Sequence, residues 1–593
     1  MNITRLFDIL ELYRNDFSWK TDAFARNENN EWIRYSSGDY VELSSLVSYG
    51  LMEMGVKKGD KIVTISQNRP EWNFLDMGMA QAGIVHVPVY PTLSASDQEY
   101  ILRHSEARML IVSDRQLLQK IKPQAEKIDN LEYIFTFSQV EGERQWLEIL
   151  EKGKESAEKR KEELEKLKAT IEENDLLTII YTSGTTGNPK GVMLSHRNIL
   201  SNAMTTASML PLNSSHRALS FLPLCHVYER MMNYNFQING VSLYYVENLG
   251  KIGDYIKEVK PHVFNTVPRL IEKVYDSIVA KGKDLKGIKK SIFFWSLKIA
   301  HDFELNNGKR WYYEKKRKLA DRLVFSKWRK GLGGDIELMV SGGSSLQERL
   351  LRVFWAAGIP VYEGYGLTES SPVIAVNDPV SRKRVKFGTV GPVLAGVEVR
   401  IAEDGEILCK GPNVMMGYYK DDEQTREVID QEGWLHTGDI GVMVDEIFVK
   451  ITDRKKEMFK TSAGKYIAPQ VIENILKESM LIEQAMVVGA NEKFASALIS
   501  PNFNYLHFFA TKHKIHFQDN EDLIRQPQII KKIQGEVNTA NKRLGQTEQI
   551  KRFRLVCDEW SPQTGALSPT LKLKRKVIYE KYERILQEIY GHA

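Results

Sequence analysis

The sequence predicts an α/β protein with more than one domain. Short apolar runs of the kind found in buried strands alternate with helix-like stretches in the first half of the chain, at 61–66 (KIVTIS), 83–89 (GIVHVPV) and 109–112 (MLIV). The segment 388–417 differs, because turn residues separate short alternating runs there, and this predicts antiparallel β-structure with a hairpin turn at 404–405. With 593 residues, 42% of them hydrophobic, the chain can bury a sizeable core.

Cysteine usage and the N-terminal sequence exclude several protein classes. Cys225, Cys409 and Cys557 lie far apart and form no C-x-x-C pair, so we expect neither a disulfide framework nor a zinc site, and a reducing cytoplasm is the expected compartment. The first 17 residues carry a charge every few positions and contain no signal-peptide stretch. We therefore expect a cytoplasmic chain that is neither secreted nor integral to a membrane.

The segment 151–175 carries dense mixed charge, and its apolar anchors are Leu164, Leu167 and Ile171. This pattern predicts an exposed helix or linker. Residues 176–181 then form a short apolar run, which predicts a strand that leads into the loop after it.

That loop, 181–191 (YTSGTTGNPKG), has the residue types of a phosphate-binding loop. Its glycines allow backbone N–H groups to approach an anion closely, its hydroxyls donate hydrogen bonds, and Lys190 supplies a point charge. A Walker A loop would have G-K-[ST], whereas Lys190 lies between Pro189 and Gly191. Composition alone is also compatible with a flexible surface turn, but the order STG, TTG, PKG is much rarer.

Basic charge is concentrated in the segment 281–330, which has 16 Lys and Arg residues against 5 Asp and Glu residues, whereas the whole chain has a net charge of +5. Aromatic residues are interleaved with these cations: Phe293, Phe294, Trp295, Trp311, Tyr312, Tyr313, Phe325 and Trp328. Such a segment is typical of a helical insertion whose aromatics pack on the protein body, or of a surface that contacts anionic lipid. Binding to nucleic acid is a third, less favoured interpretation.

Four ordered motifs give the chain a family resemblance. The loop 181–191, the segments 364–369 (GYGLTE) and 433–439 (GWLHTGD), and a fourth motif that opens at 451–456 (ITDRKK) resemble the core motifs of the adenylate-forming, or AMP-binding, enzymes. The segment 465–469 (KYIAP) is similar to the segment typical of the long-chain fatty acyl-CoA synthetase branch of this family.

The resemblance implies a large N-terminal domain at 1–452, built from layered α/β subdomains and a β-rich subdomain, with the basic helical insertion at about 281–330. It also implies a small, mobile α+β C-terminal domain at 453–593 that turns about a hinge at Asp453.

The same resemblance assigns the substrate contacts. Tyr365 would stack on adenine opposite Gly343, Asp439 would accept hydrogen bonds from the ribose, and Gly464 would let the pantetheine arm of CoA pass close to the backbone. Mg²⁺ would be held by Glu369 with help from Thr182. The full set of expected nucleotide and CoA contacts is Thr182, Ser183, Gly184, Thr185, Thr186, Gly187, Lys190, Gly343, Tyr365, Gly366, Thr368, Asp439, Arg454 and Gly464.

The expected catalytic residues are Lys572, Lys190, His226 and Glu369. Lys572 would enter the adenylation site from the last motif, but Thr570-Leu571 replaces the family's usual Ser-Gly before it, so Lys574 stays an alternative. His226, within 222–230 (LPLCHVYER), matches a segment that borders the acyl pocket in the family. We expect the neighbouring Cys225 to be a packing residue.

The function implied is ATP-dependent activation of a long-chain fatty acid to acyl-AMP and its transfer to CoA, giving acyl-CoA, AMP and pyrophosphate. A fatty acyl-AMP ligase that loads a carrier protein, or a ligase for a medium-chain or aryl acid, would share the motifs. A noncatalytic acyl-binding scaffold is disfavoured because Lys190, Glu369, Asp439 and Lys572 are all present. The expected partners are fatty acid, ATP and CoA, with peripheral contact of the basic insertion at the inner face of the membrane and no nucleic acid.

Overall fold

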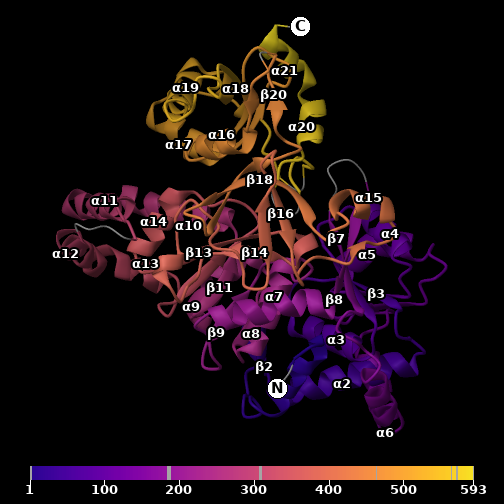
Figure 1. Ribbon diagram of the computed structural model, residues 1–593. Coiled ribbons are helices and arrows are strands. Elements are labelled where there is room, and N and C mark those ends of the chain that lie inside the picture. Colours follow the sequence, from indigo (N-terminus) through magenta and orange to yellow (C-terminus); the bar gives the residue numbers. More distant parts are fainter. Residues whose placement is uncertain are drawn as a thin grey trace. The chain divides into compact units, whose positions relative to one another are not determined.

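The computed structural model describes residues 3–182, 188–305, 310–462, 464–561, 564–568 and 572–591. The chain forms two compact units (Figure 1). Unit 1 consists of 1–399, 408–436 and 445–449, and unit 2 consists of 400–407, 437–444 and 450–593. Among the described residues, we find no helix with the length and apolar character needed to cross a bilayer. The mixed α/β class expected from the sequence is confirmed, and the predicted domain division at Asp453 stays a prediction.

One sheet of unit 1 has the strand order β17-β8-β7-β4-β3-β5-β6. Strands β3 to β7 pair in parallel, whereas β8 runs antiparallel to both β7 and β17. The predicted strands are present, because β3, β4, β5 and β7 coincide with the apolar runs. The bounds are β3 Lys61–Ile65, β4 Val85–Val89, β5 Met109–Val112, β6 Tyr133–Thr136, β7 Leu176–Thr182, β8 Lys190–Ser195 and β17 Gly417–Tyr418.

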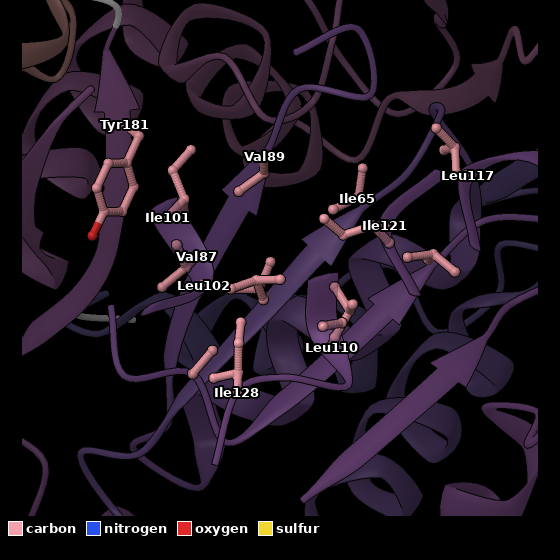
Figure 2. Close-up of a cluster of buried hydrophobic side chains, with 14 of the residues drawn as sticks. Ile65, Val87, Val89, Ile101, Leu102, Leu110, Leu117, Ile121, Ile128 and Tyr181 are labelled. Atoms are coloured by element: carbon pink, nitrogen blue, oxygen red, sulfur yellow. The ribbon is translucent and has the colours of Figure 1, made fainter. Parts of the chain in front are cut away.

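Helices α4 (Ala95–His104) and α5 (Arg115–Ala125) cover one face of this sheet. Figure 2 shows Ile101, Leu102 and Ile121 from these helices meeting side chains of the strands. The cluster reaches Tyr181 on β7, next to the end of the strand that leads into the predicted phosphate loop. This core therefore fixes the base of that loop.

A second group of helices contains α2 (Ser37–Glu53), α3 (Pro70–Gln81) and α6 (Leu147–Lys168). The predicted helix near 151–175 is present as α6, and of its expected anchors Leu164 and Ile171 are buried. It is more than an exposed helix, because α2 and α6 pack closely through two glycines. A Cβ atom on Gly50 would lie 1.9 Å from the carbonyl oxygen of Ile149, and one on Gly153 would lie 2.0 Å from that of Leu46.

The other sheet of unit 1 has the order β14-β13-β12-β11-β9-β10-β1-β2. The strands from β13 to β1 in this order are parallel, and β14 and β2 are antiparallel edges. The bounds are β1 Phe24–Glu28, β2 Glu31–Tyr35, β9 Arg217–Ser220, β10 Ser242–Tyr245, β11 Val263–Thr266, β12 Leu338–Ser341, β13 Val361–Gly366 and β14 Val373–Val376. Helices α8 Val227–Ile238, α9 Ile252–Val259 and α14 Glu348–Ala356 contact strands of this sheet, and α1 Ile9–Arg14 and α7 His196–Met209 pack on α8.

The predicted antiparallel segment 388–417 is only partly as expected. Strands β15 (Glu398–Ile401) and β16 (Glu406–Lys410) flank the predicted turn, where Gly405 N donates to the carbonyl oxygen of Ala402 at 2.9 Å. They belong to a sheet of order β15-β16-β18-β19, with β18 Leu435–Val444 and β19 Phe448–Arg454. The end of the segment departs from the prediction, because β17 does not belong to this sheet and pairs with β8 instead.

The basic segment is helical, as predicted. It contains part of α10 (Pro268–Asp284), then α11 (Gly287–His301), α12 (Arg310–Ala320), a π-helical turn η3 (Asp321–Phe325) and α13 (Ser326–Gly331). Of its aromatic residues, Phe293, Phe325 and Trp328 are buried, Trp311 and Tyr312 are exposed, and Phe294, Trp295 and Tyr313 are half-buried.

Unit 2 is an α+β domain around the sheet β22-β23-β24 (Ile482–Val488, Ser496–Pro501 and Arg552–Leu555) and the short pair β20-β21 (Phe459–Lys460 and Tyr466–Ile467). Apolar side chains of β22 and β23 form one core with α16, α17 and α19, and another with the C-terminal helices. The helix bounds are α16 Pro469–Leu476, α17 Phe503–Lys512, α18 Asn520–Arg525, α19 Pro527–Asn541, α20 Arg575–Lys581 and α21 Glu583–Tyr590.

Candidate active site

The predicted phosphate loop connects two antiparallel neighbours, β7 and β8. Thr182 and Lys190 lie opposite each other where the strands end, so both side chains flank the loop. The predicted contacts Ser183, Gly184, Thr185, Thr186 and Gly187 lie outside the described residues. A loop between paired strands differs from a Walker A loop, which leads directly into a helix.

Glu369 and Lys190 are brought together by a residue that the sequence analysis missed, Tyr418. The Tyr418 hydroxyl donates to Glu369 Oε1 at 2.9 Å, and Lys190 Nζ lies 5.3 Å from the centroid of the Tyr418 ring. Burial, together with the nearby Glu369 carboxylate, raises the pKa of Tyr418. The phenol therefore keeps its proton and acts as a donor to the carboxylate.

The backbone fixes this arrangement. Strand β17 places Tyr418 opposite Val192 on β8, two residues after Lys190. Met415 N donates to the carbonyl oxygen of Glu369 at 2.9 Å, which ties the short helical turn η4 (Thr368–Ser370) to the approach to β17. A cation, a carboxylate and a phenol thus converge at the end of the β7–β8 hairpin.

The Gly343 and Tyr365 positions lie at one edge of the second sheet. Ser341 on β12 pairs with Glu363 on β13, so Gly343 and Tyr365 each follow two residues after a paired position. The strands are parallel, and ligands of α/β proteins bind at the carboxyl ends of such strands. A Cβ atom on Gly343 would meet nothing within 4 Å, so the space beside it is open.

Gly366 has a packing role at the end of β13, and its expected nucleotide contact stays a prediction. A Cβ atom there would lie 1.6 Å from the carbonyl oxygen of Pro372, so this position requires glycine for packing alone. Leu367 N and the Ser370 hydroxyl both donate to that same carbonyl, at 3.1 and 2.6 Å. These bonds hold the turn that carries Thr368 and Glu369.

His226 precedes α8 and caps its first turn. Its Nδ1 atom accepts from the Tyr228 backbone N–H at 3.1 Å, so a neutral imidazole carries its proton at Nε2. The Tyr228 hydroxyl donates to the carbonyl oxygen of Val340 at 2.9 Å, at the end of β12. His226 is therefore linked to the strand end that precedes Gly343. Burial raises the pKa of the adjacent Cys225 thiol, which agrees with a packing role and not a nucleophilic one.

The remaining predicted residues belong to unit 2. Asp439 on β18 is buried, and its Oδ1 lies 3.3 Å from Nε of Arg454, which ends β19. Gly464 has a φ of +74° in the turn between β20 and β21, where a Cβ atom would meet nothing within 4 Å. The open turn and the positive φ both suit glycine.

The predicted hinge residue Asp453 is buried beside the Asp439–Arg454 pair. Its carboxylate accepts from the backbone N–H groups of Arg454 at 2.6 Å and Gln470 at 3.3 Å. Burial nevertheless raises the pKa of Asp453 to about 6.

Lys572 and Lys574 are both exposed on a hairpin whose strands meet at Leu567 and Leu573. The hairpin is closed by Ser568 N, which donates to the carbonyl oxygen of Lys572 at 2.8 Å. Arg575 anchors its base, through ion pairs with Glu473 at 2.7 Å and Glu457 at 3.0 Å. Lys574 directly precedes that anchor in the sequence, whereas Lys572 lies three residues before it.

Two family models match the chain. One, described as AMP-binding enzyme, matches residues 17–419, and one described as AMP-binding enzyme C-terminal domain matches residues 457–593. Long-chain-fatty-acid–CoA ligase FadD15 of Mycobacterium tuberculosis is 33% identical over 566 residues, covering 94% of this chain and 93% of that protein. Long chain acyl-CoA synthetase 3 of Arabidopsis thaliana is 32% identical, with 94% of this chain and 87% of that protein covered.

Solved structures show the same fold at lower identity. The anthranilate CoA ligase AuaEII in complex with anthranoyl-AMP has a TM-score of 0.69 and 17% identity, with 97% of each chain covered. A fatty acyl CoA synthetase of Mycobacterium tuberculosis has a TM-score of 0.61 and 20% identity, with 98% of this chain and 99% of that chain covered.

Proposed function

The chain belongs to the AMP-binding enzyme family, and we propose that it activates a long-chain fatty acid with ATP and transfers the acyl group to CoA. The products are acyl-CoA, AMP and pyrophosphate. The observation that carries this proposal is the convergence of Lys190, Tyr418 and Glu369 at the ends of the loop between β7 and β8. The near full-length similarity to long-chain-fatty-acid–CoA ligases supports the choice of acid and acceptor.

The residues present fit a magnesium ion that arrives with ATP. Within the described parts of the chain, no group of three or more His, Cys, Asp or Glu side chains could hold a metal by itself. Mg²⁺ does not need such a group, since it keeps several waters and binds through one or two carboxylates and substrate phosphates. Glu369, with Thr182 at the loop end, would hold it, and the ion would neutralise charge on the ATP phosphates.

In the first half-reaction, a carboxylate oxygen of the fatty acid attacks the α-phosphorus of ATP. A P–O bond forms, the bond to the β-phosphate oxygen breaks, and pyrophosphate leaves. Lys190 stabilises charge on the β- and γ-phosphates, and Lys572 stabilises charge at the α-phosphate and the carboxylate. Tyr418 keeps the Glu369 carboxylate in place by donating to one of its oxygens.

In the second half-reaction, the sulfur of CoA attacks the acyl carbonyl and its thiol proton is released to solvent. The bond between the carbonyl carbon and the phosphate oxygen breaks, and AMP leaves. His226 borders the acyl group. Its Nε2–H is the group that would donate a hydrogen bond to the acyl carbonyl oxygen. Asp439 accepts hydrogen bonds from the ribose hydroxyls, with Arg454 beside it. Tyr365 and Gly343 flank the adenine. Thr368 lies on the same turn as Glu369. Gly464 gives the pantetheine arm room at an open turn.

We also propose that the protein works in the cytoplasm and contacts the inner face of the membrane peripherally through the basic segment 281–330. Long-chain fatty acids partition into bilayers because each buried methylene contributes about 0.8 kcal/mol. A cationic, aromatic surface would keep the enzyme near its substrate.

The test is AMP release from ATP by purified protein, with acetate, octanoate and palmitate compared in the presence and absence of CoA. CoA-dependent AMP release that is highest with palmitate supports the proposal. Acyl-AMP that forms but is not transferred to CoA points to a carrier-protein acceptor, and highest turnover with octanoate points to a medium-chain substrate. No turnover with any acid refutes the proposed reaction.

A further inference from the structure

Helix α12 of the basic segment has one side packed against the protein and the opposite side exposed. Figure 1 shows α11, α12 and α13 close to α14, and these helices pack against one another. The inward side of α12 is fixed by two hydrogen bonds: the Tyr313 hydroxyl donates to the carbonyl oxygen of Ile299 at 2.8 Å, and Arg317 Nη1 donates to that of Ala356 at 3.2 Å. Ala320 is fully buried on the same side.

The opposite side exposes large apolar groups. Trp311 is 69% exposed, Tyr312 58%, Leu319 49% and, one turn further into η3, Leu323 39%. Positions 311, 312, 315, 316, 319 and 323 repeat at helical spacing, so these side chains share one face. The two rings lie 6.0 Å apart. Exposed large apolar side chains also occur singly elsewhere, as at Trp19 and Phe508, but α12 and η3 place four of them on one continuous helical face.

Cations are interleaved with these apolar groups. Lys315 Nζ lies 4.6 Å from the centroid of the Trp311 ring, and Lys316 Nζ lies 4.3 Å from that of Tyr312. Lys318 and Arg322 are exposed on the same helical stretch. The ammonium groups thus lie close to the exposed aromatic rings, and such pairs of cationic and aromatic side chains are typical of a membrane interface.

Charge at this surface is strongly one-sided. The stretch 310–330 contains nine Lys and Arg residues and two acidic residues, a net charge of +7. Both acidic side chains are already paired with arginines that flank the inward side. Glu314 lies 2.9 Å from Arg317 Nη2, and Asp321 lies 2.5 Å from Arg329 Nη1. Both acidic charges of this stretch therefore lie beside arginines, and the outward lysines add positive charge to the surface.

We propose that the face of α12 formed by Trp311, Tyr312, Lys315, Lys318 and Leu319 binds the surface of an anionic phospholipid bilayer. This inference rests on the membrane contact proposed above and assigns it to one helix face, because α11 directs Phe293 and Leu297 into the protein. The net charge of +7 is complementary to anionic headgroups, and the exposed rings and leucines suit the boundary between headgroups and acyl chains. Leucine side chains have neither a charge nor a hydrogen-bond donor for a nucleic-acid backbone. Their exposure on this face therefore favours lipid over nucleic acid as the binding partner.

The experiment is sedimentation of the full-length protein with vesicles of phosphatidylcholine, with and without phosphatidylglycerol, in the absence of substrates. The wild type should bind the phosphatidylglycerol vesicles, and added salt should weaken the binding. The double variant Lys315→Gln, Lys318→Gln should bind about 30-fold more weakly, as expected for the loss of two basic residues near an anionic surface. The matched control is Lys154→Gln, Lys161→Gln, which removes two exposed lysines from α6 and should bind as wild type does.

A second pair of variants tests the apolar part of the face. Trp311→Ser should weaken vesicle binding at least about tenfold, whereas Trp19→Ser, which replaces a tryptophan that is 63% exposed elsewhere in unit 1, should not. Equal binding by the wild type and all variants would overturn the inference, as would no vesicle binding, or binding to duplex DNA instead of vesicles. A protein that binds vesicles but forms no acyl-CoA from palmitate would refute the proposed function and leave this inference standing.

Discussion

At the scale of single residues, the site depends on a tyrosine that the motifs do not include. Tyr418 contacts both the predicted metal ligand Glu369 and the predicted phosphate ligand Lys190. Its neighbour Tyr419 resembles it in sequence but has different contacts, since its hydroxyl donates to Glu106 at 3.4 Å. The pair therefore offers a variant and a matched control at adjacent positions.

Tyr418→Phe should lower kcat/KM of acyl-AMP formation about tenfold and raise the Mg²⁺ concentration needed for half-maximal rate. The loss of one hydrogen bond to a charged group is worth about 1.5 kcal/mol, and an unrestrained Glu369 would bind the metal less well. Pyrophosphate exchange into ATP, measured against Mg²⁺ concentration, reports both effects. Tyr419→Phe should behave as wild type, and equal behaviour of the two variants would argue against the proposed role of Tyr418.

Asp453 makes stability depend on pH in a defined direction. Its pKa is raised from 3.8 to about 6 in the folded state by burial, so the folded protein binds the proton more tightly than the unfolded chain does. The stabilising contribution of the protonated form is complete below pH 3.8 and is lost as the pH rises through about 6. Asp453→Asn keeps a neutral side chain at every pH and should not show this loss.

The measurement is the difference in Tm between Asp453→Asn and the wild type, across pH 4 to 8, which cancels the other titrating groups. The Tm of the variant relative to the wild type should rise as the pH increases through about 6. A difference that does not vary with pH would mean that the Asp453 carboxyl titrates in the folded protein as it does in the unfolded chain.

At the scale of elements, the local patterns in the sequence predicted strands and helices more successfully than contacts between them. The apolar runs at β3, β4, β5 and β7 and the charged helix α6 were all predicted, because apolar runs and hydrophobic periodicity can be recognised in consecutive residues. The pairing of β17 with β8 was not, because it joins a two-residue strand to a distant segment and leaves no local periodicity. Tyr418 was missed for the same reason.

The crossing of α2 and α6 is a second contact that the pattern did not reveal. Gly153→Ala should lower the Tm of unit 1, because the added Cβ would lie 2.0 Å from the carbonyl oxygen of Leu46 and the helices would have to separate. Overpacking of this kind costs about 1–3 kcal/mol. Thermal unfolding followed by circular dichroism measures the change.

The matched control is Gly253→Ala, which places a Cβ on a helical glycine of the same unit with nothing within 4 Å. This variant should be neutral or more stable by up to about 1 kcal/mol, since alanine favours helix. If Gly153→Ala is as stable as this control, the close packing of α2 on α6 is wrong.

At the scale of the whole molecule, the sequence resemblance predicted the family and the mixed α/β class, and both are confirmed. The contacts within the chain place 400–407 and 437–444 in unit 2 together with 450–593, and the predicted domain division at Asp453 stays a prediction. A linear motif cannot predict that 400–407 and 437–444 belong to unit 2, since β16, β18 and β19 each run from one unit into the other. Asp439, Arg454, Gly464 and Lys572 therefore all lie in unit 2, whereas Thr182, Lys190, His226 and Glu369 lie in unit 1.

The two half-reactions should depend differently on the lysines of unit 2. Lys572→Ala should slow acyl-AMP formation by on the order of 100-fold, the cost of removing one preorganised charge-stabilising donor. The same variant should still transfer the acyl group from supplied acyl-AMP to CoA at nearly the wild-type rate. Lys574→Ala should leave both steps nearly unchanged, and a reversal of the two variants would assign the adenylation role to Lys574.

The most direct test of the proposed function follows the oxygen atoms of the fatty acid. Palmitate labelled with ¹⁸O in its carboxylate is incubated with the protein, ATP, Mg²⁺ and CoA, and the products are analysed by mass spectrometry. Attack of the carboxylate on the α-phosphorus predicts one ¹⁸O atom in AMP and one in palmitoyl-CoA. Label in inorganic phosphate together with ADP, or unlabelled AMP, would contradict the acyl-adenylate mechanism.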